Sequence, residues 1–160
     1  MWVAWIVCIV AGLAAGYVHW RMYALAKALG PNLIDRTPRF RRHDLELVRS
    51  ALEHRKELLA KHRKVAMLDL WFAPLVTVAV GALVWGIGYW HALGWLPVTI
   101  AILAGLADQA ENVFVRRILA APHRSVPQAE VTVLAVATSA KFAGYVLAVL
   151  AAFAIVALVR

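Results

Sequence analysis

Long apolar stretches alternate with polar connections along this chain of 160 residues. A helix rises about 1.5 Å per residue, so roughly 20 apolar residues cross the hydrocarbon core of a bilayer, which is about 30 Å thick. Four stretches approach or exceed that length: residues 2–18, 66–90, 93–115 and 131–159. The pattern predicts an all-α fold in a single membrane domain, a four-helix transmembrane bundle.

A shorter stretch, residues 43–65, has the pattern of an amphipathic helix. Its apolar positions recur at helical spacing among Arg, Lys and Glu. They are Leu45, Val48, Leu52 and Leu59. No Gly or Pro occurs between Pro38 and Pro74, so this helix can continue directly into the second span. We expect it to lie on anionic lipid headgroups or to pack on a partner protein. Nucleic acid is not an expected partner, because no reading motif is present.

Small residues recur at four-residue spacing within the predicted spans. The pairs are Gly12/Gly16, Ala82/Gly86, Ala101/Gly105 and Ala140/Gly144. Such spacing lets two membrane helices approach closely. Only the first pair is a full G-x-x-x-G motif.

Composition supports the membrane prediction. Hydrophobic residues make up 63% of the chain, whereas roughly 45–50% is usual for soluble domains. The single cysteine, Cys8, excludes an intramolecular disulfide. No basic segment precedes the first apolar stretch, so we expect this stretch to be an uncleaved anchor rather than a signal peptide.

Positive charge is concentrated in two connections. Residues 20–65 contain twelve Lys or Arg and five acids, and the 116–130 connection adds three arginines, whereas the 87–97 turn has no charge. Basic loops stay in the cytoplasm, so we expect both connections inside and both termini outside. The residues expected to contact headgroups are Arg39, Arg41, Arg42, Arg49, Arg55 and Lys56.

A few polar residues interrupt the predicted spans. An ionisable group at membrane depth costs at least ~2.5–3.5 kcal/mol, which makes each one a candidate for function. Asp108 and Glu111 stand three residues apart and share one helix face. We expect Lys141 to pair with either acid, provided that the fourth helix begins some turns outside the membrane. The full set is Asp69, Asp108, Glu111, Asn112, Thr138 and Lys141.

Two interpretations of this set remain open. It is either a buried polar clasp that fixes helix register, or an ion, proton or headgroup site that opens toward the cytoplasm. Haem is not expected, because the histidines lie at span ends or in basic connections. The chain also lacks the Glu-x-x-His pairs of di-iron bundles, the ligand spacing of zinc sites and the motifs of nucleophilic catalysis. We therefore expect no catalytic residue, no metal and no cofactor.

Three segments carry a resemblance to known proteins: LDLWFAP at Leu68–Pro74, LADQAENVFVRRIL at Leu106–Leu119, and the later Pro127, Thr138 and Lys141. A fourth, LGPNLIDRTPRFRRHDLELV, precedes the second span. Together they resemble a family of small, uncharacterised bacterial four-span membrane proteins. The resemblance implies a helical bundle and no particular activity. The residues to which it points are Asp69, Asp108, Glu111, Asn112 and Lys141.

The expected function is that of a non-enzymatic accessory or scaffold component of a bacterial inner membrane. The alternative is a small transporter or lipid-handling protein that uses the acid–lysine cluster. The expected partners are anionic membrane lipids, together with either a membrane protein or a second copy of the chain.

Overall fold

The computed structural model describes residues 2–27, 29, 42–88, 92–120 and 125–159. Four of its helices are long and apolar enough to cross a membrane, which indicates a multi-pass membrane protein and confirms the predicted all-α four-helix bundle. A fifth, short helix precedes the second span. The helices are α1 (Trp2–Lys27), α2 (Arg42–Glu53), α3 (Lys56–Gly88), α4 (Trp95–Ala120) and α5 (Gln128–Val159).

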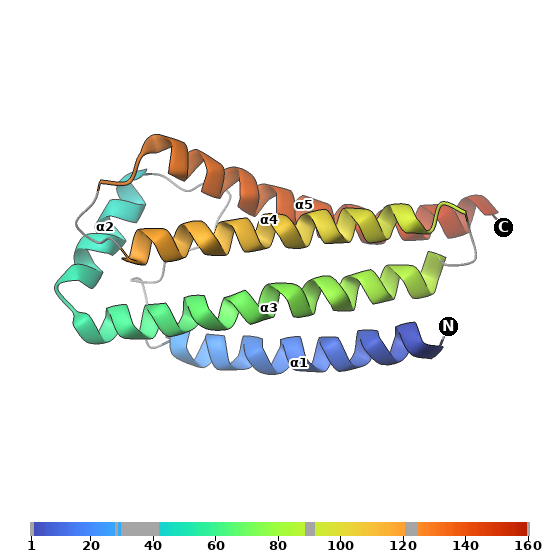
Figure 1. The fold of residues 1–160 in the computed structure, drawn as a ribbon, viewed down its shortest axis with the longest axis horizontal. Coiled ribbons are helices and arrows are strands. Elements are labelled where there is room, and N and C mark those ends of the chain that lie inside the picture. Colours follow the sequence, from blue (N-terminus) through green and yellow to red (C-terminus); the bar gives the residue numbers. More distant parts are fainter. Residues whose placement is uncertain (1, 28, 30–41, 89–91, 121–124, 160) are drawn as a thin grey trace.

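The long helices run alternately up and down (Figure 1). Helix α1 packs on α3, α3 packs on α4, and α4 packs on α5, while α5 also contacts α3. The N- and C-terminal ends lie at the same end of the bundle, and α2 lies across the opposite end. With 33 residues, α3 is about 50 Å long, which is more than the thickness of a hydrocarbon core, and it contacts α2.

The amphipathic stretch forms two helices rather than the single helix predicted over residues 43–65. The chain turns at His54 and Arg55, where the Arg55 N–H donates to the Leu52 carbonyl oxygen at 3.2 Å. Only residues 56–65 continue into the second span. A straight helix would carry Leu45 and Leu52 away from the bundle. The turn instead folds α2 back, and both leucines are 1% exposed.

The apolar face of α2 is thus covered by its own chain. It joins a cluster at this end of the bundle whose members come from α2, α3, α4, α5 and the segment before α5. Leu59 packs against its edge, and the Val48 side chain lies outside the described part. The cluster consists of Leu45, Leu52, Ala66, Val115, Ile118, Val126, Val131 and Leu134.

A second apolar cluster fills the other half of the bundle. Its members are Val84, Ala101, Ala148 and Ala152, and each is 0% exposed. Asp69 of α3 lies between the residues of these two clusters along the chain, and so do the buried polar residues of α4 and α5. His62 of α3 is also buried, but it lies before the first cluster. The bundle therefore has a polar layer between two apolar layers.

Close approach of the helices depends on two glycines. A Cβ on Gly105 would collide with the Thr77 side chain of α3, and one on Gly144 would lie 2.7 Å from the Ala104 Cβ of α4. Gly12 and Gly16 have no such neighbour within 4 Å. The full G-x-x-x-G motif of α1 therefore faces away from the bundle, whereas single glycines permit the contacts of α4 with α3 and α5.

Candidate functional site

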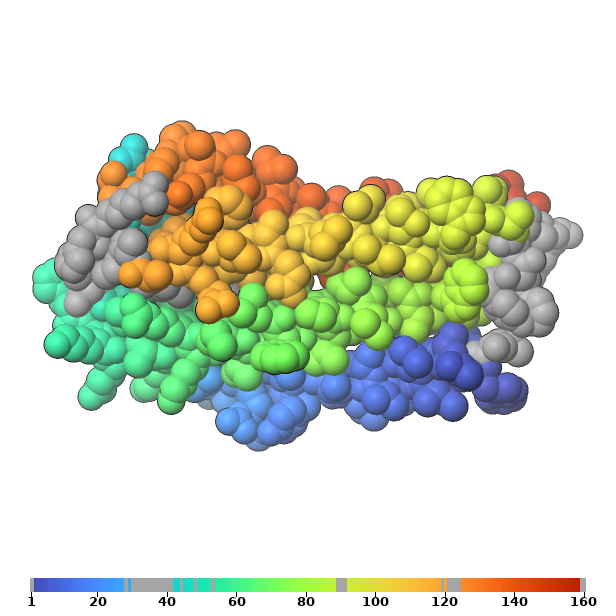
Figure 2. Space-filling model, viewed as in Figure 1, coloured from blue at the N-terminus to red at the C-terminus, as the bar shows by residue number. Residues whose placement is uncertain are grey.

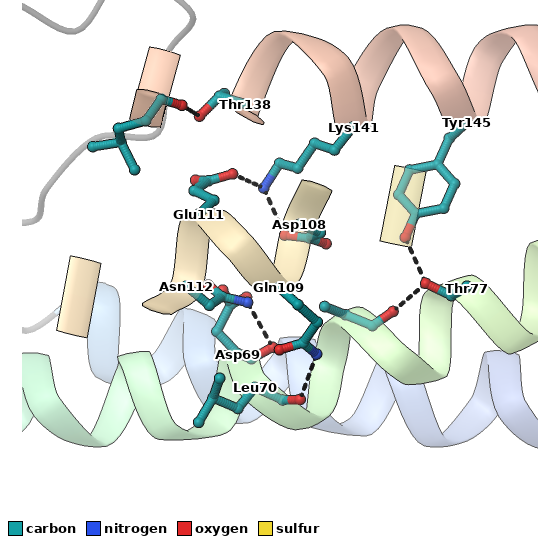
Figure 3. Close-up of polar contacts among 12 residues, drawn as sticks. Asp69, Leu70, Thr77, Asp108, Gln109, Glu111, Asn112, Thr138, Lys141 and Tyr145 are labelled. Atoms are coloured by element: carbon teal, nitrogen blue, oxygen red, sulfur yellow. Dashed lines mark hydrogen bonds and ion pairs between the residues drawn. The ribbon is translucent and has the colours of Figure 1, made fainter. Parts of the chain in front are cut away.

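The polar layer is centred on Lys141 of α5, which reaches two acids of α4. Its Nζ lies 3.0 Å from Asp108 Oδ1 and 2.7 Å from Glu111 Oε2 (Figure 3). Lys141 is 8% exposed, Asp108 4% and Glu111 0%. The sequence predicted one partner acid, and the structure provides both. Helix α5 begins at Gln128, about 20 Å of helix before Lys141, which places the ammonium level with the acids.

Local sequence explains why these three side chains converge. Asp108 and Glu111 are i,i+3 neighbours on the face of α4 toward α5. The long aliphatic stem of Lys141 lets its ammonium reach both carboxyl groups. The same ammonium lies 5.3 Å from the centroid of the Phe142 ring. Removing these charges from water is costly, and the cost is offset only where each has close opposite charge.

A third acid lies in this layer. Asp69 of α3 is 2% exposed and close enough to Asp108 for an electrostatic interaction. Three buried carboxyl groups therefore accompany one buried ammonium. Asn112 links the same region to α3, because its Nδ2 donates to the backbone carbonyl of Asp69 at 3.3 Å.

Gln109 compensates for a proline within α3. Pro74 has no N–H, so the carbonyl of Leu70, four residues earlier, loses its normal helical donor. The Gln109 side chain donates to that carbonyl at 3.1 Å from α4. An unpaired carbonyl in hydrocarbon costs several kcal/mol, and neighbouring helices commonly supply the missing donor in membrane proteins. Gln109 thus adds a second side chain-to-backbone bond between α4 and α3 (Figure 3).

A third link joins α3 to α5. The hydroxyls of Thr77 and Tyr145 lie 2.9 Å apart, and Thr77 also donates to the Ala73 carbonyl of its own helix at 2.8 Å. Thr138, in contrast, is 0% exposed but donates to the Leu134 carbonyl one turn earlier in α5, at 2.9 Å. It shares the face of Lys141 without bridging to another helix.

Gln109 and Thr77 were not among the residues predicted from the sequence. The sequence contained one signal for Gln109. Pro74 leaves a backbone carbonyl inside an apolar span without its helical hydrogen-bond donor, and Gln109 is one of few amides in the spans. Thr77 had no comparable signal, because a threonine in an apolar helix usually bonds its own backbone.

The residues predicted to contact headgroups are in different environments. Arg42 is exposed and forms an ion pair with Glu46 at 2.7 Å. Arg49 is buried at 9% exposure, so it is not on the lipid-accessible surface. Arg55 and Lys56 are exposed at the turn into α3. Arg39 and Arg41 lie outside the described residues.

The described residues contain no group of three His, Cys, Asp or Glu side chains placed to hold a metal ion. Comparison with protein-family models, curated proteins and solved structures yielded no match.

The Lys141 contacts predict strong energetic coupling. Lys141→Met should destabilise the bundle by up to ~3–5 kcal/mol, because two buried acids lose their cation. Asp108→Leu and Glu111→Met should each couple to it by ~0.5–3 kcal/mol in double-mutant cycles. Thermal unfolding in detergent measures the effect, with Thr138→Val as the matched buried control, expected to cost ~1 kcal/mol. Strict additivity of Lys141→Met with both acid substitutions would contradict the assignment.

The hydrogen bond from Gln109 to Leu70 predicts that the contribution of Gln109 to stability depends on Pro74. Gln109→Leu should cost ~1–3 kcal/mol, because the Leu70 carbonyl is left buried and unpaired. In the Pro74→Ala background, position 74 regains its N–H and can bond that carbonyl itself. The cost of Gln109→Leu should then fall close to zero in the same unfolding assay. An equal loss in both backgrounds would show that Gln109 acts in some other way.

Proposed function

We propose that this protein is a non-enzymatic accessory or scaffold component of a membrane, in which the polar layer fixes the relative positions of α3, α4 and α5. One observation carries this proposal. Lys141 contacts Asp108 and Glu111 directly, and all three are less than 10% exposed between two apolar clusters. A substrate would have to displace these mutual contacts before it could bind.

The lining of the two surface clefts agrees with this proposal. These clefts, of about 610 and 560 Å³, are formed by described residues, and Lys141, Asp108 and Glu111 line neither of them. The direct contacts within the polar layer are suited to holding helices in register. A scaffold of this kind acts through a membrane-protein partner or a second copy of the chain.

The buried acids favour one alternative, a small transporter that moves protons or cations. Asp69, Asp108 and Glu111 are each at most 4% exposed in the layer. Intramembrane acids serve as relays in pumps and transporters. This alternative requires the layer to open during a transport cycle.

Proton flux distinguishes the two functions. The protein is reconstituted in vesicles that contain a pH-sensitive dye, and a pH gradient is imposed in the presence of valinomycin. The matched variant combines the substitutions Lys141→Met, Asp108→Leu and Glu111→Met. A scaffold should give the flux of protein-free vesicles with both proteins, and the variant, which lacks the contacts that fix the helix register, should capture less partner from native membranes than wild type does. A flux that the variant abolishes would establish the transporter and overturn the scaffold.

We further propose a bacterial inner-membrane location with α2 and the basic connections in the cytoplasm and both termini outside. The uneven distribution of Lys and Arg supports this orientation. A cysteine introduced at Ser50, exposed on α2, should resist an impermeant thiol reagent in intact spheroplasts. A cysteine at Ala92, exposed before α4, should react. Both variants carry Cys8→Ala, and lysed membranes give the full-labelling control. The reverse pattern would contradict the orientation.

A further inference from the structure

A surface cleft lies between α3 and α4 near the end of the bundle that carries α2. Its volume is about 610 Å³, within the range of roughly 300–1,000 Å³ that is typical of ligand sites. Three arginines contribute its charge: Arg63 from α3, and Arg116 and Arg117 from α4. Its other described walls are apolar, formed by Ala66, Met67, Val113 and Ala120. Figure 2 shows α3 in green and α4 in orange to yellow, side by side along the bundle.

Apart from Ala120, which follows the arginines on α4, the apolar lining of the cleft lies closer to the centre of the bundle than the charged lining does. Arg63 stands four residues before Met67, and Arg116 three residues after Val113. Because α3 and α4 are antiparallel, both arginines lie about one turn farther from the centre of the bundle than their apolar neighbours. Arg116 and Arg117 also stand within the last turns of the apolar part of α4, which ends at Ile118. In a bilayer that the four apolar helices span, this order puts the arginines nearer the headgroups and Met67 and Val113 nearer the acyl chains.

The electrostatics of the cleft select an anion. No acidic side chain is among its described lining residues, and Arg63, Arg116 and Arg117 are all exposed to solvent. The Arg117 guanidinium lies 5.9 Å from the centroid of the Phe114 ring, a contact that limits where it can point. Guanidinium groups bind phosphate with two parallel hydrogen bonds, and basic pockets between membrane helices on the cytoplasmic side bind anionic lipid headgroups.

We propose that this cleft binds one anionic phospholipid. Arg116 and Arg117 hold its phosphate and Arg63 stands on the opposite wall, while an acyl chain lies along Met67 and Val113. This site is distinct from the basic surface around α2, and it does not depend on the scaffold role of the polar layer.

Lipid titration of the purified, delipidated protein tests the proposal. Phosphatidylglycerol, phosphatidylcholine and soluble glycerol 3-phosphate are added separately in neutral detergent, and bound molecules are counted by native mass spectrometry. One phosphatidylglycerol should bind in preference to phosphatidylcholine.

Each arginine near a headgroup is worth a factor of about 5 in affinity, so R116Q/R117Q should weaken binding by about 25-fold. The matched control R21Q/K27Q removes the same charge from exposed positions on α1 and should change affinity less than threefold.

A second pair of variants tests the apolar wall without altering charge. Val113→Trp should fill the cleft and reduce phosphatidylglycerol binding at least tenfold. Leu106→Trp adds the same ring at an exposed position two turns away on α4 and should leave binding unchanged. Circular dichroism verifies that each variant is folded. Equal weakening by the two charge variants, equal binding of the two lipids, no effect of Val113→Trp, or equal binding of glycerol 3-phosphate would each overturn the proposal.

Discussion

Every polar group at membrane depth needs a hydrogen-bond or ion-pair partner, and the architecture of the bundle depends on this constraint. Lys141 meets this need with Asp108 and Glu111, at 3.0 and 2.7 Å. Lipid tails are as apolar as leucine, so hydrophobicity alone does not set the register of one membrane helix against another. A buried ion pair does, because sliding α5 along α4 by a turn would separate the charges by about 5 Å.

Amide side chains apply the same constraint between α4 and α3. Asn112 and Gln109 bond backbone carbonyls of α3 rather than side chains. The position of α4 against α3 that they favour therefore depends on which carbonyls of α3 their amide groups can reach. In a regular helix those carbonyls bond within the helix. Pro74 frees one of them, and the proline is thereby part of the interface although its ring is exposed. Gly105 and the Ala104–Gly144 contact bring the three helices close enough for these short bonds.

The end of the bundle that carries α2 has a different chemistry. Beyond the apolar part of α3 the chain is amphipathic, and α2 buries its leucines in the cluster with α4 and α5. This arrangement uses the apolar face of α2 for internal packing and leaves Arg55 and Lys56 at the surface. The lipid site that we propose takes its arginines and its apolar wall from two helices, so it depends on how α3 and α4 pack against each other and not on α2.

The sequence by itself determined the number of spans, the all-α class and the residues of the polar layer. These properties are local, because the free energy of transferring a residue into hydrocarbon depends on that residue and its near neighbours along the helix. Tertiary structure decided the turn at His54, the burial of Arg49, the simultaneous contact of Lys141 with both acids, and the bond from Gln109 to Leu70. It also decided that Gly105 and Gly144, rather than Gly12 and Gly16, lie at close contacts. Each of these features depends on how one helix is rotated and shifted against another, and the periodicity of a single helix carries no information about its neighbour.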